Sequence, residues 1–186
     1  MDILKNIKFI IFDFDGTLFD LRVDWDRLRQ YLKASTDRGL GHIIQEYVDN
    51  GEEEKLKLIT NMEIDGVGGR SVDPVTIDTL RNLINKGTEL AIFTRNSRSV
   101  VEVSLKGTSL DGKIKIIGRE DVRQQKPQPE GIDALTNLLG VQKSETILVG
   151  DTHHDIDAAR NAGIQVIIVK NNKLSFIPEG ADQYIN

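Results

Sequence analysis

Short, unbroken apolar runs recur along the chain and are separated by segments in which apolar residues repeat every three or four positions. Apolar runs of this length are typical of strands that are buried on both faces of a parallel sheet. They predict strands at 7–12, 89–93, 113–117, 146–149 and 165–169, with a short last strand at 183–185. Helical spacing between the strands predicts an α/β fold, a doubly wound parallel sheet with right-handed crossovers.

The segment 21–72 interrupts this alternation because all of its periodicity is helical. Asp24 can cap the first of three short helices expected there. We expect Trp25 and Tyr31 to pack in the core of this helical unit. The chain is therefore predicted to have two domains, a catalytic core of residues 1–20 and 73–186 and an inserted helical cap of residues 21–72.

Oxygen-bearing side chains directly follow three of the predicted strands. These are Asp13, Thr94 and Asp151, and Lys126 comes from a loop expected at the same edge. Ligands of open α/β sheets bind at the carboxyl ends of the strands, so we expect these side chains to meet in one crevice. Asp15 leans the same way as Asp13, because side chains alternate along a strand. Two carboxylates so close repel unless a cation or a proton lies between them.

Composition narrows the classes of function. The 186 residues carry a formal net charge of −5 with both signs mixed, which is unlike the clustered basic surface of a nucleic-acid-binding protein. The absence of cysteine excludes disulfides, thiolate chemistry and cysteine-ligated metals. No apolar run approaches the roughly 20 residues of a membrane span. We therefore expect a cytoplasmic protein that binds neither nucleic acid nor membrane.

Four motifs occur in order along the chain, three of them at predicted strand ends and one in a loop: Asp13-Phe14-Asp15-Gly16-Thr17, Ile92-Phe93-Thr94-Arg95-Asn96, Lys126-Pro127 and Gly150-Asp151-Thr152-His153-His154-Asp155. Together they resemble the motifs of the haloacid dehalogenase (HAD) superfamily, specifically its phosphoglycolate phosphatase-like members with a helical C1 cap. The resemblance covers the whole chain and implies a HAD-like Rossmannoid core. It also implies a cap between the first and second motifs, where 21–72 lies.

The resemblance implies a phosphoric monoester hydrolase that works through an aspartyl-phosphate. Asp13 would be the nucleophile, because a carboxylate can split a difficult hydrolysis into two easier steps. Asp15 would protonate the leaving oxygen and later deprotonate the attacking water. Thr94 and Lys126 would hold the phosphoryl oxygens and neutralise developing charge.

The implied cofactor is Mg²⁺, a hard cation that takes a few oxygen ligands. Asp13, Asp151 and the main-chain carbonyl of Asp15 would supply them. Asp155 would lie behind these ligands and orient waters or Lys126.

The remaining residues near the motifs have less specific expected roles. Gly16, Thr17, Arg95 and Asn96 are expected to contact the phosphate or the rest of the substrate, a small phosphorylated metabolite. Arg119 lies at the same edge, where contact with substrate competes with ordinary surface charge. His153 and His154 are expected to be solvent-exposed loop residues, because adjacent histidines rarely face one site.

Two other functions stay open at this point. A phosphotransferase or mutase of the same family would carry the same motifs and pass the phosphoryl group to another hydroxyl. A phosphoacceptor signalling domain also gathers Asp, Thr and Lys at strand ends, but it lacks a helical insertion after the first strand. The exact phosphoester, the oligomeric state and any protein partner are not predicted.

Overall fold

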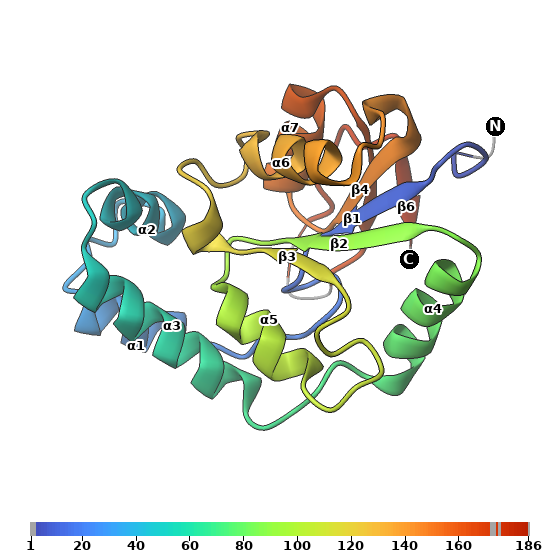
Figure 1. Ribbon diagram of the computed structural model, residues 1–186. Coiled ribbons are helices and arrows are strands. Elements are labelled where there is room, and N and C mark those ends of the chain that lie inside the picture. Colours follow the sequence, from blue (N-terminus) through green and yellow to red (C-terminus); the bar gives the residue numbers. More distant parts are fainter. Residues whose placement is uncertain (1–2, 172–173, 175, 186) are drawn as a thin grey trace.

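The computed structural model describes residues 3–171, 174 and 176–185. A parallel sheet of six strands lies at its centre, in the order β3-β2-β1-β4-β5-β6 (Figure 1). The strands are β1 (Phe9–Phe12), β2 (Glu89–Phe93), β3 (Lys115–Ile117), β4 (Thr146–Gly150), β5 (Gln165–Val169) and β6 (Gln183–Ile185). The strand order runs outward in both directions from the β1–β4 pair, which is the switch point where such sheets bind ligands. The predicted fold class is confirmed.

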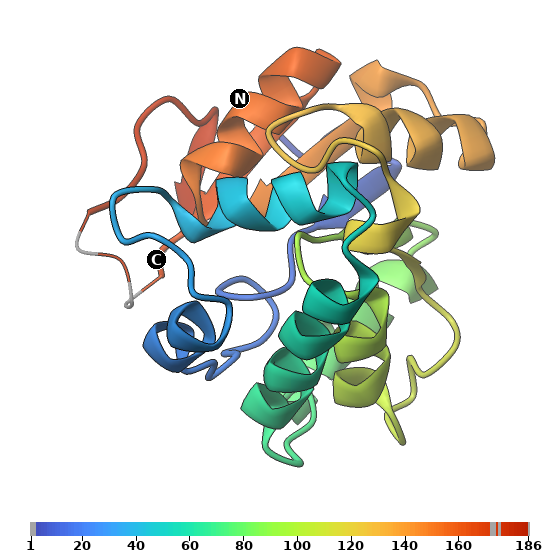
Figure 2. The same ribbon diagram turned by 90° about the vertical axis from the view of Figure 1, so that its left-hand side faces the viewer.

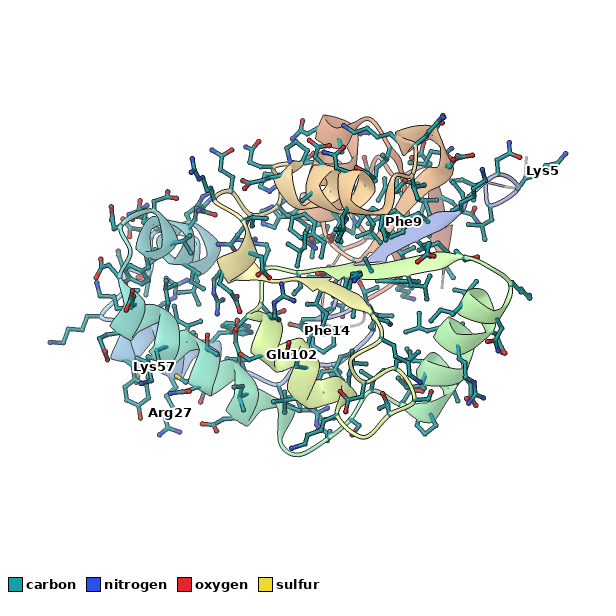
Figure 3. All side chains as sticks on the ribbon, viewed as in Figure 1. Lys5, Phe9, Phe14, Arg27, Lys57 and Glu102 are labelled. Carbon is teal, nitrogen blue, oxygen red and sulfur yellow. The ribbon has the colours of Figure 1, made fainter. Side chains whose placement is uncertain are left out.

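Helices cover both faces of the sheet (Figure 1). One face carries α4 (Pro74–Asn85) and α5 (Arg98–Leu105), and the other carries α6 (Glu130–Leu139) and α7 (His153–Ala162). Successive side chains of β1 point to opposite faces of the sheet and so contribute to both apolar layers. Ile10 and Phe12 pack toward α4 and α5, whereas Phe9 and Ile11 pack toward α6 and α7. Figure 3 shows Phe9 and, beyond the strand, Phe14 on opposite sides of the sheet. Both apolar layers fix the position of β1 and therefore of its carboxyl end.

The remaining helices, α1 (Trp25–Tyr31), α2 (Leu40–Asp49) and α3 (Glu53–Val67), all lie within the predicted cap segment. They share an apolar cluster of their own, with Leu28, Leu32, Ile43, Ile44, Tyr47 and Ile59 buried in it. Helix α3 packs beside α5 of the core, and α2 lies across the edge of the sheet formed by the carboxyl ends of the strands (Figure 2). Treating this unit as a separate domain stays a prediction.

The expectation that Trp25 and Tyr31 pack in the cap core is wrong. Their side chains are 39% and 52% exposed. Helix α1 has only two turns, and Leu28 alone supplies its buried face. Tyr31 instead lies on the outer side, where its hydroxyl accepts hydrogen bonds from Arg27.

Two smaller differences concern the ends of elements. Strand β3 begins at Lys115, two residues later than predicted. His153 and His154 belong to the first turn of α7 rather than to a loop. In the described part of the chain, none of the helices combines the length and the apolar character needed to cross a bilayer.

Candidate active site

The strands β1, β2 and β4 end at the same level. Their register places Phe12 beside both Ile92 and Val149, so the residues that follow emerge together at one edge of the sheet. A cavity of about 400 Å³ lies at this edge, between the sheet and the cap. It is lined by the predicted site residues Asp13, Asp15, Thr94, Arg95, Asn96 and Lys126. Thr152 and His154 of the fourth motif also line it, so the structure brings residues of all four motifs to one cavity.

Lys126 lies between two buried carboxylates. Its Nζ is 2.7 Å from Asp13 Oδ1 and 2.6 Å from Asp155 Oδ1. Burial alone would lower the pKa of Lys126, but the charges of Asp13 and Asp155 outweigh it and raise that pKa. Conversely, burial would raise the pKa of Asp155, and the Lys126 ammonium instead holds it below its usual value. Lys126 and Asp155 therefore form a fixed ion pair beside Asp13.

Asp13, Asp151 and Asp155 form a compact acidic cluster. Each offers a carboxylate oxygen, and these oxygens lie within 4.8 Å of one another. Burial raises the pKa of Asp13 to about 7 and also raises that of Asp151. Three carboxylates against one ammonium leave an excess of negative charge in a buried place. An all-oxygen donor set with this excess fits a hard divalent cation.

The turn after β1 brings the first motif against Asp151. Gly16 has φ +86°, a left-handed conformation that favours glycine, and a Cβ there would overlap Asp151 Oδ2. The next residue, Thr17, donates its hydroxyl to Asp151 Oδ1 at 3.3 Å. The Asn171 amide donates to Oδ2 of the same carboxylate at 2.6 Å. Gly16 and Thr17 therefore lie against a candidate metal ligand.

Asp15 is half-buried and reaches the cavity from the same turn. Its Oδ1 accepts a hydrogen bond of 2.9 Å from the main-chain N–H of Leu21. This contact fixes the carboxylate in the wall of the cavity that Asp13 also lines, outside the compact acidic cluster. Such a position suits a group that exchanges protons with a bound molecule.

Thr94 is buried and is joined to the cap through Asn96. The Thr94 hydroxyl donates to Asn96 Oδ1 at 2.9 Å, and Asn96 Nδ2 donates to Glu63 Oε1 at 3.0 Å. Glu63 belongs to α3 of the cap. The Asn96 side chain, which was predicted to contact substrate, thus lines the cavity, but its amide group is hydrogen-bonded to Thr94 and Glu63.

Glu63 and Arg119 form a buried ion pair between the cap and the core. Their side chains are 1% and 3% exposed, and Arg119 Nη2 is 2.9 Å from Glu63 Oε2. Arg119 also donates to the main-chain oxygen of Arg95 and to Thr60 Oγ1. Its role is therefore to hold the cap helix against the sheet edge rather than to act as ordinary surface charge.

Sequence reasoning missed Glu63, although a signal was present. Glu63 stands between Ile59 and Val67 at intervals of four, on the buried face of α3. A carboxylate on an apolar stripe needs a partner, because an unpaired buried charge is costly. That spacing could have marked Glu63 as half of an ion pair without naming Arg119.

Breaking this pair should destabilise the protein. Glu63→Leu leaves the Arg119 guanidinium buried without its carboxylate, and we expect the free energy of unfolding to fall by about 3–5 kcal/mol. Adding Arg119→Met should recover much of the loss, because both charges are then removed together. Urea denaturation measures both effects. Arg81→Met, at an exposed surface pair, is the matched control, and equal losses in the single and double variants would contradict the pairing.

Arg95 and His154 approach the cavity from different elements. Arg95 is half-buried, and its burial lowers the pKa of its guanidinium. His154 also lines the cavity and is half-buried, so the expectation of a solvent-exposed residue is wrong for it. Burial, followed by the charge of Arg95, lowers the pKa of His154 to about 4. His153 is exposed, as expected.

Comparisons with known proteins agree with this geometry. Residues 26–169 match the family model described as haloacid dehalogenase-like hydrolase. A curated relative named pyrophosphatase PpaX, from Anoxybacillus flavithermus, is 42% identical over 87 residues, 46% of this chain and 40% of that protein. The chain spans only 40–43% of the length of three curated relatives with this name.

Two longer matches extend over most of the chain. Phosphoglycolate phosphatase 1 of Pseudomonas aeruginosa is 26% identical over 183 residues, covering 85% of this chain and 67% of that protein. The crystal structure of a putative phosphoglycolate phosphatase from Lactobacillus delbrueckii subsp. bulgaricus superposes with a TM-score of 0.73 at 19% identity, covering 97% of this chain and 95% of that one. The structural likeness, at this identity, concerns the fold.

Proposed function

Because the chain belongs to the haloacid dehalogenase-like hydrolases, we propose that it hydrolyses a small phosphate monoester with Mg²⁺, through an aspartyl-phosphate on Asp13. The observation that carries this proposal is the buried cluster at the strand ends. Asp13 lies there within reach of Lys126, Asp151 and Asp155. Asp15 lines the same cavity.

The proposed reaction has two steps. In the first, a carboxylate oxygen of Asp13 attacks phosphorus, the bond from phosphorus to the ester oxygen breaks, and Asp15 gives that oxygen its proton. In the second, Asp15 takes a proton from water, and the water oxygen attacks the same phosphorus. The bond between phosphorus and Asp13 then breaks, which releases inorganic phosphate and restores the Asp13 carboxylate and the protonated Asp15.

The other residues hold charge in place during these steps. Lys126 is fixed by Asp155 and can donate to a phosphoryl oxygen as negative charge shifts onto it. The Thr94 hydroxyl, now bonded to Asn96, is placed to turn toward a second phosphoryl oxygen. Asp13, Asp151 and the main-chain carbonyl of Asp15 would hold Mg²⁺, which when bound offsets the repulsion between the carboxylates and the phosphate.

The size and lining of the cavity support a small substrate. About 400 Å³ is shared between the phosphate site and the leaving group. The cap supplies Trp25, Leu40 and Ile44 to its walls. Relatives named phosphoglycolate phosphatase and pyrophosphatase PpaX point in the same direction. We propose phosphoglycolate as the first substrate to test, with other small phosphoesters and the anhydride pyrophosphate next.

The phosphoacceptor signalling alternative is dropped, because the chain carries the helical insertion that such domains lack and belongs to a hydrolase family. Phosphoryl transfer to a second hydroxyl remains to be separated from hydrolysis by assay. None of the described residues that line the cavity favours that transfer over attack by water.

The test is a panel of phosphorylated metabolites assayed with Mg²⁺ for released phosphate and ranked by kcat/KM. We expect the kcat/KM of small phosphorylated acids, small sugar phosphates or pyrophosphate to exceed that of nucleotides. Subtracting the rate of Asp13→Asn, purified in parallel, removes contaminating phosphatases. A clear preference for nucleotides or phosphoprotein would contradict the proposed substrate class. Loss of substrate without stoichiometric phosphate would indicate transfer rather than hydrolysis.

A further inference from the structure

Arg95 carries a charge that the described part of the chain leaves unpaired. Its side chain is half-buried in the cavity wall, yet no hydrogen bond or ion pair joins its guanidinium to a described residue. Its main-chain oxygen is used, by Arg119. A guanidinium offers five donors, and burial without acceptors is unfavourable.

The other cations that line the cavity are all engaged. Lys126 is held by Asp13 and Asp155, and Arg119 by Glu63. Arg29 of α1 donates to the main-chain oxygens of Ser35 and Arg38. Among the described residues that line the cavity, Arg95 is therefore the cation whose guanidinium has neither a hydrogen bond nor an ion pair to another described residue.

The cap leaves room for this guanidinium. Helix α2 carries Gly41 at its second residue, and a Cβ at this position would overlap Arg95 Nη2. Gly41 also lines the cavity. The absence of a side chain at 41 thus lets the Arg95 fork lie between the cap and the sheet edge.

The place of Arg95 relates it to the leaving group. Arg95 directly follows Thr94, and Thr94 lies beside the proposed phosphate position at the end of β2. The guanidinium extends from there to Gly41 on the cap, the side on which the leaving group must lie. A group bound by Arg95 would therefore lie on the leaving-group side of the cavity, next to the proposed phosphate position.

We infer that Arg95 forms a subsite for a second anionic group, a carboxylate or a phosphate, carried on the leaving group of the substrate. The inference rests on the proposed phosphatase function and narrows its substrate class to phosphoesters with an anionic leaving group. A planar guanidinium binds either group through paired hydrogen bonds. Because Gly41 belongs to the cap, binding of that anion also joins cap and core through the substrate.

The experiment compares 2-phosphoglycolate with its carboxamide isostere, which lacks only the second charge, and includes pyrophosphate as the phosphate arm. The wild-type enzyme should prefer the carboxylate. Arg95→Gln should lower kcat/KM for the anionic esters by roughly 10- to 100-fold, the effect of losing a charge-assisted hydrogen-bonding pair. For the carboxamide, the same substitution should change kcat/KM by no more than about 3-fold. The arm that loses more, phosphoglycolate or pyrophosphate, identifies the anion.

Two further variants control the interpretation. Gly41→Ala moves the guanidinium without changing any charge, so a smaller loss confined to the anionic esters is expected. Arg81→Gln, on the exposed face of α4, should change kcat/KM for neither the charged nor the neutral substrates. An equal loss on charged and neutral esters would assign Arg95 to the reacting phosphate and overturn the subsite, as would no loss on either. Failure of the wild type to hydrolyse any of these esters would instead overturn the proposed function itself.

Discussion

Asp13→Asn should lower kcat by at least about 100-fold, which corresponds to roughly 2.7 kcal/mol of activation free energy. Asparagine keeps the shape of the side chain but removes the charge and the nucleophilic oxygen. The substitution should therefore lower the rate of the chemical step without changing the fold, because no other group can replace the Asp13 carboxylate as the nucleophile of the first step. Steady-state phosphate release from the best substrate of the panel measures the loss.

The matched control is Asp157→Asn, an exposed carboxylate on α7. It should retain wild-type activity. Both variants should also keep the circular dichroism spectrum of the wild type, which shows that the fold is intact. Activity of Asp13→Asn above about one hundredth of the wild-type rate would remove Asp13 from the nucleophile's role.

Removal of divalent metal should abolish phosphatase activity, and added Mg²⁺ should restore that activity. Asp13, Asp151 and Asp155 bring three carboxylates together with one ammonium, so an anionic phosphate meets an excess of negative charge there. The acidic cluster needs a cation before substrate can approach Asp13. EDTA treatment followed by Mg²⁺ titration measures the requirement.

Ca²⁺ is the informative replacement for Mg²⁺. It accepts more ligands in a looser shell, so Asp13 can bind it through both oxygens and lose the one that attacks phosphorus. We therefore expect Ca²⁺ to inhibit in competition with Mg²⁺. Full activity in Ca²⁺ alone, or after exhaustive chelation, would contradict the metal assignment.

The sheet and the residues at its edge could be predicted because both depend on local pattern. Apolar runs mark buried strands, and a polar residue directly after such a run must emerge at the carboxyl end. Asp13, Thr94 and Asp151 satisfy that condition, and the equal level of their strands brings them together. The place of Lys126 needed the motif, because a loop lysine carries no positional signal of its own.

The cap and its contacts could not be predicted in the same way. A helix of two turns, such as α1, has too few residues for its periodicity to decide which face is buried, and Trp25 and Tyr31 were therefore misplaced. The Glu63–Arg119 pair joins residues 56 positions apart. Periodicity can show that Glu63 lies on a buried face, but only the packing of α3 against the core, including the turn after β3 that carries Arg119, selects its partner.

The surroundings of Arg95, at the carboxyl end of β2, could not be predicted from the sequence either. The sequence places it directly after Thr94 but says nothing of its hydrogen-bond partners. Among the described residues no side chain pairs with its guanidinium, which lies against Gly41 of α2. Such a property depends on how cap and core meet, and it becomes visible only in three dimensions.

The central claim, that Asp13 becomes phosphorylated, is tested most directly with Asp15→Asn and p-nitrophenyl phosphate. The p-nitrophenolate leaves without a proton, so the first step proceeds without Asp15, whereas water cannot be deprotonated for the second. We expect a burst of one p-nitrophenolate per enzyme, followed by slow turnover. Mass spectrometry of the acid-quenched protein should then find one phosphoryl group on the peptide containing Asp13, and none in Asp13→Asn/Asp15→Asn. Linear release without a burst, or a phosphoryl group on any other residue, would contradict the mechanism.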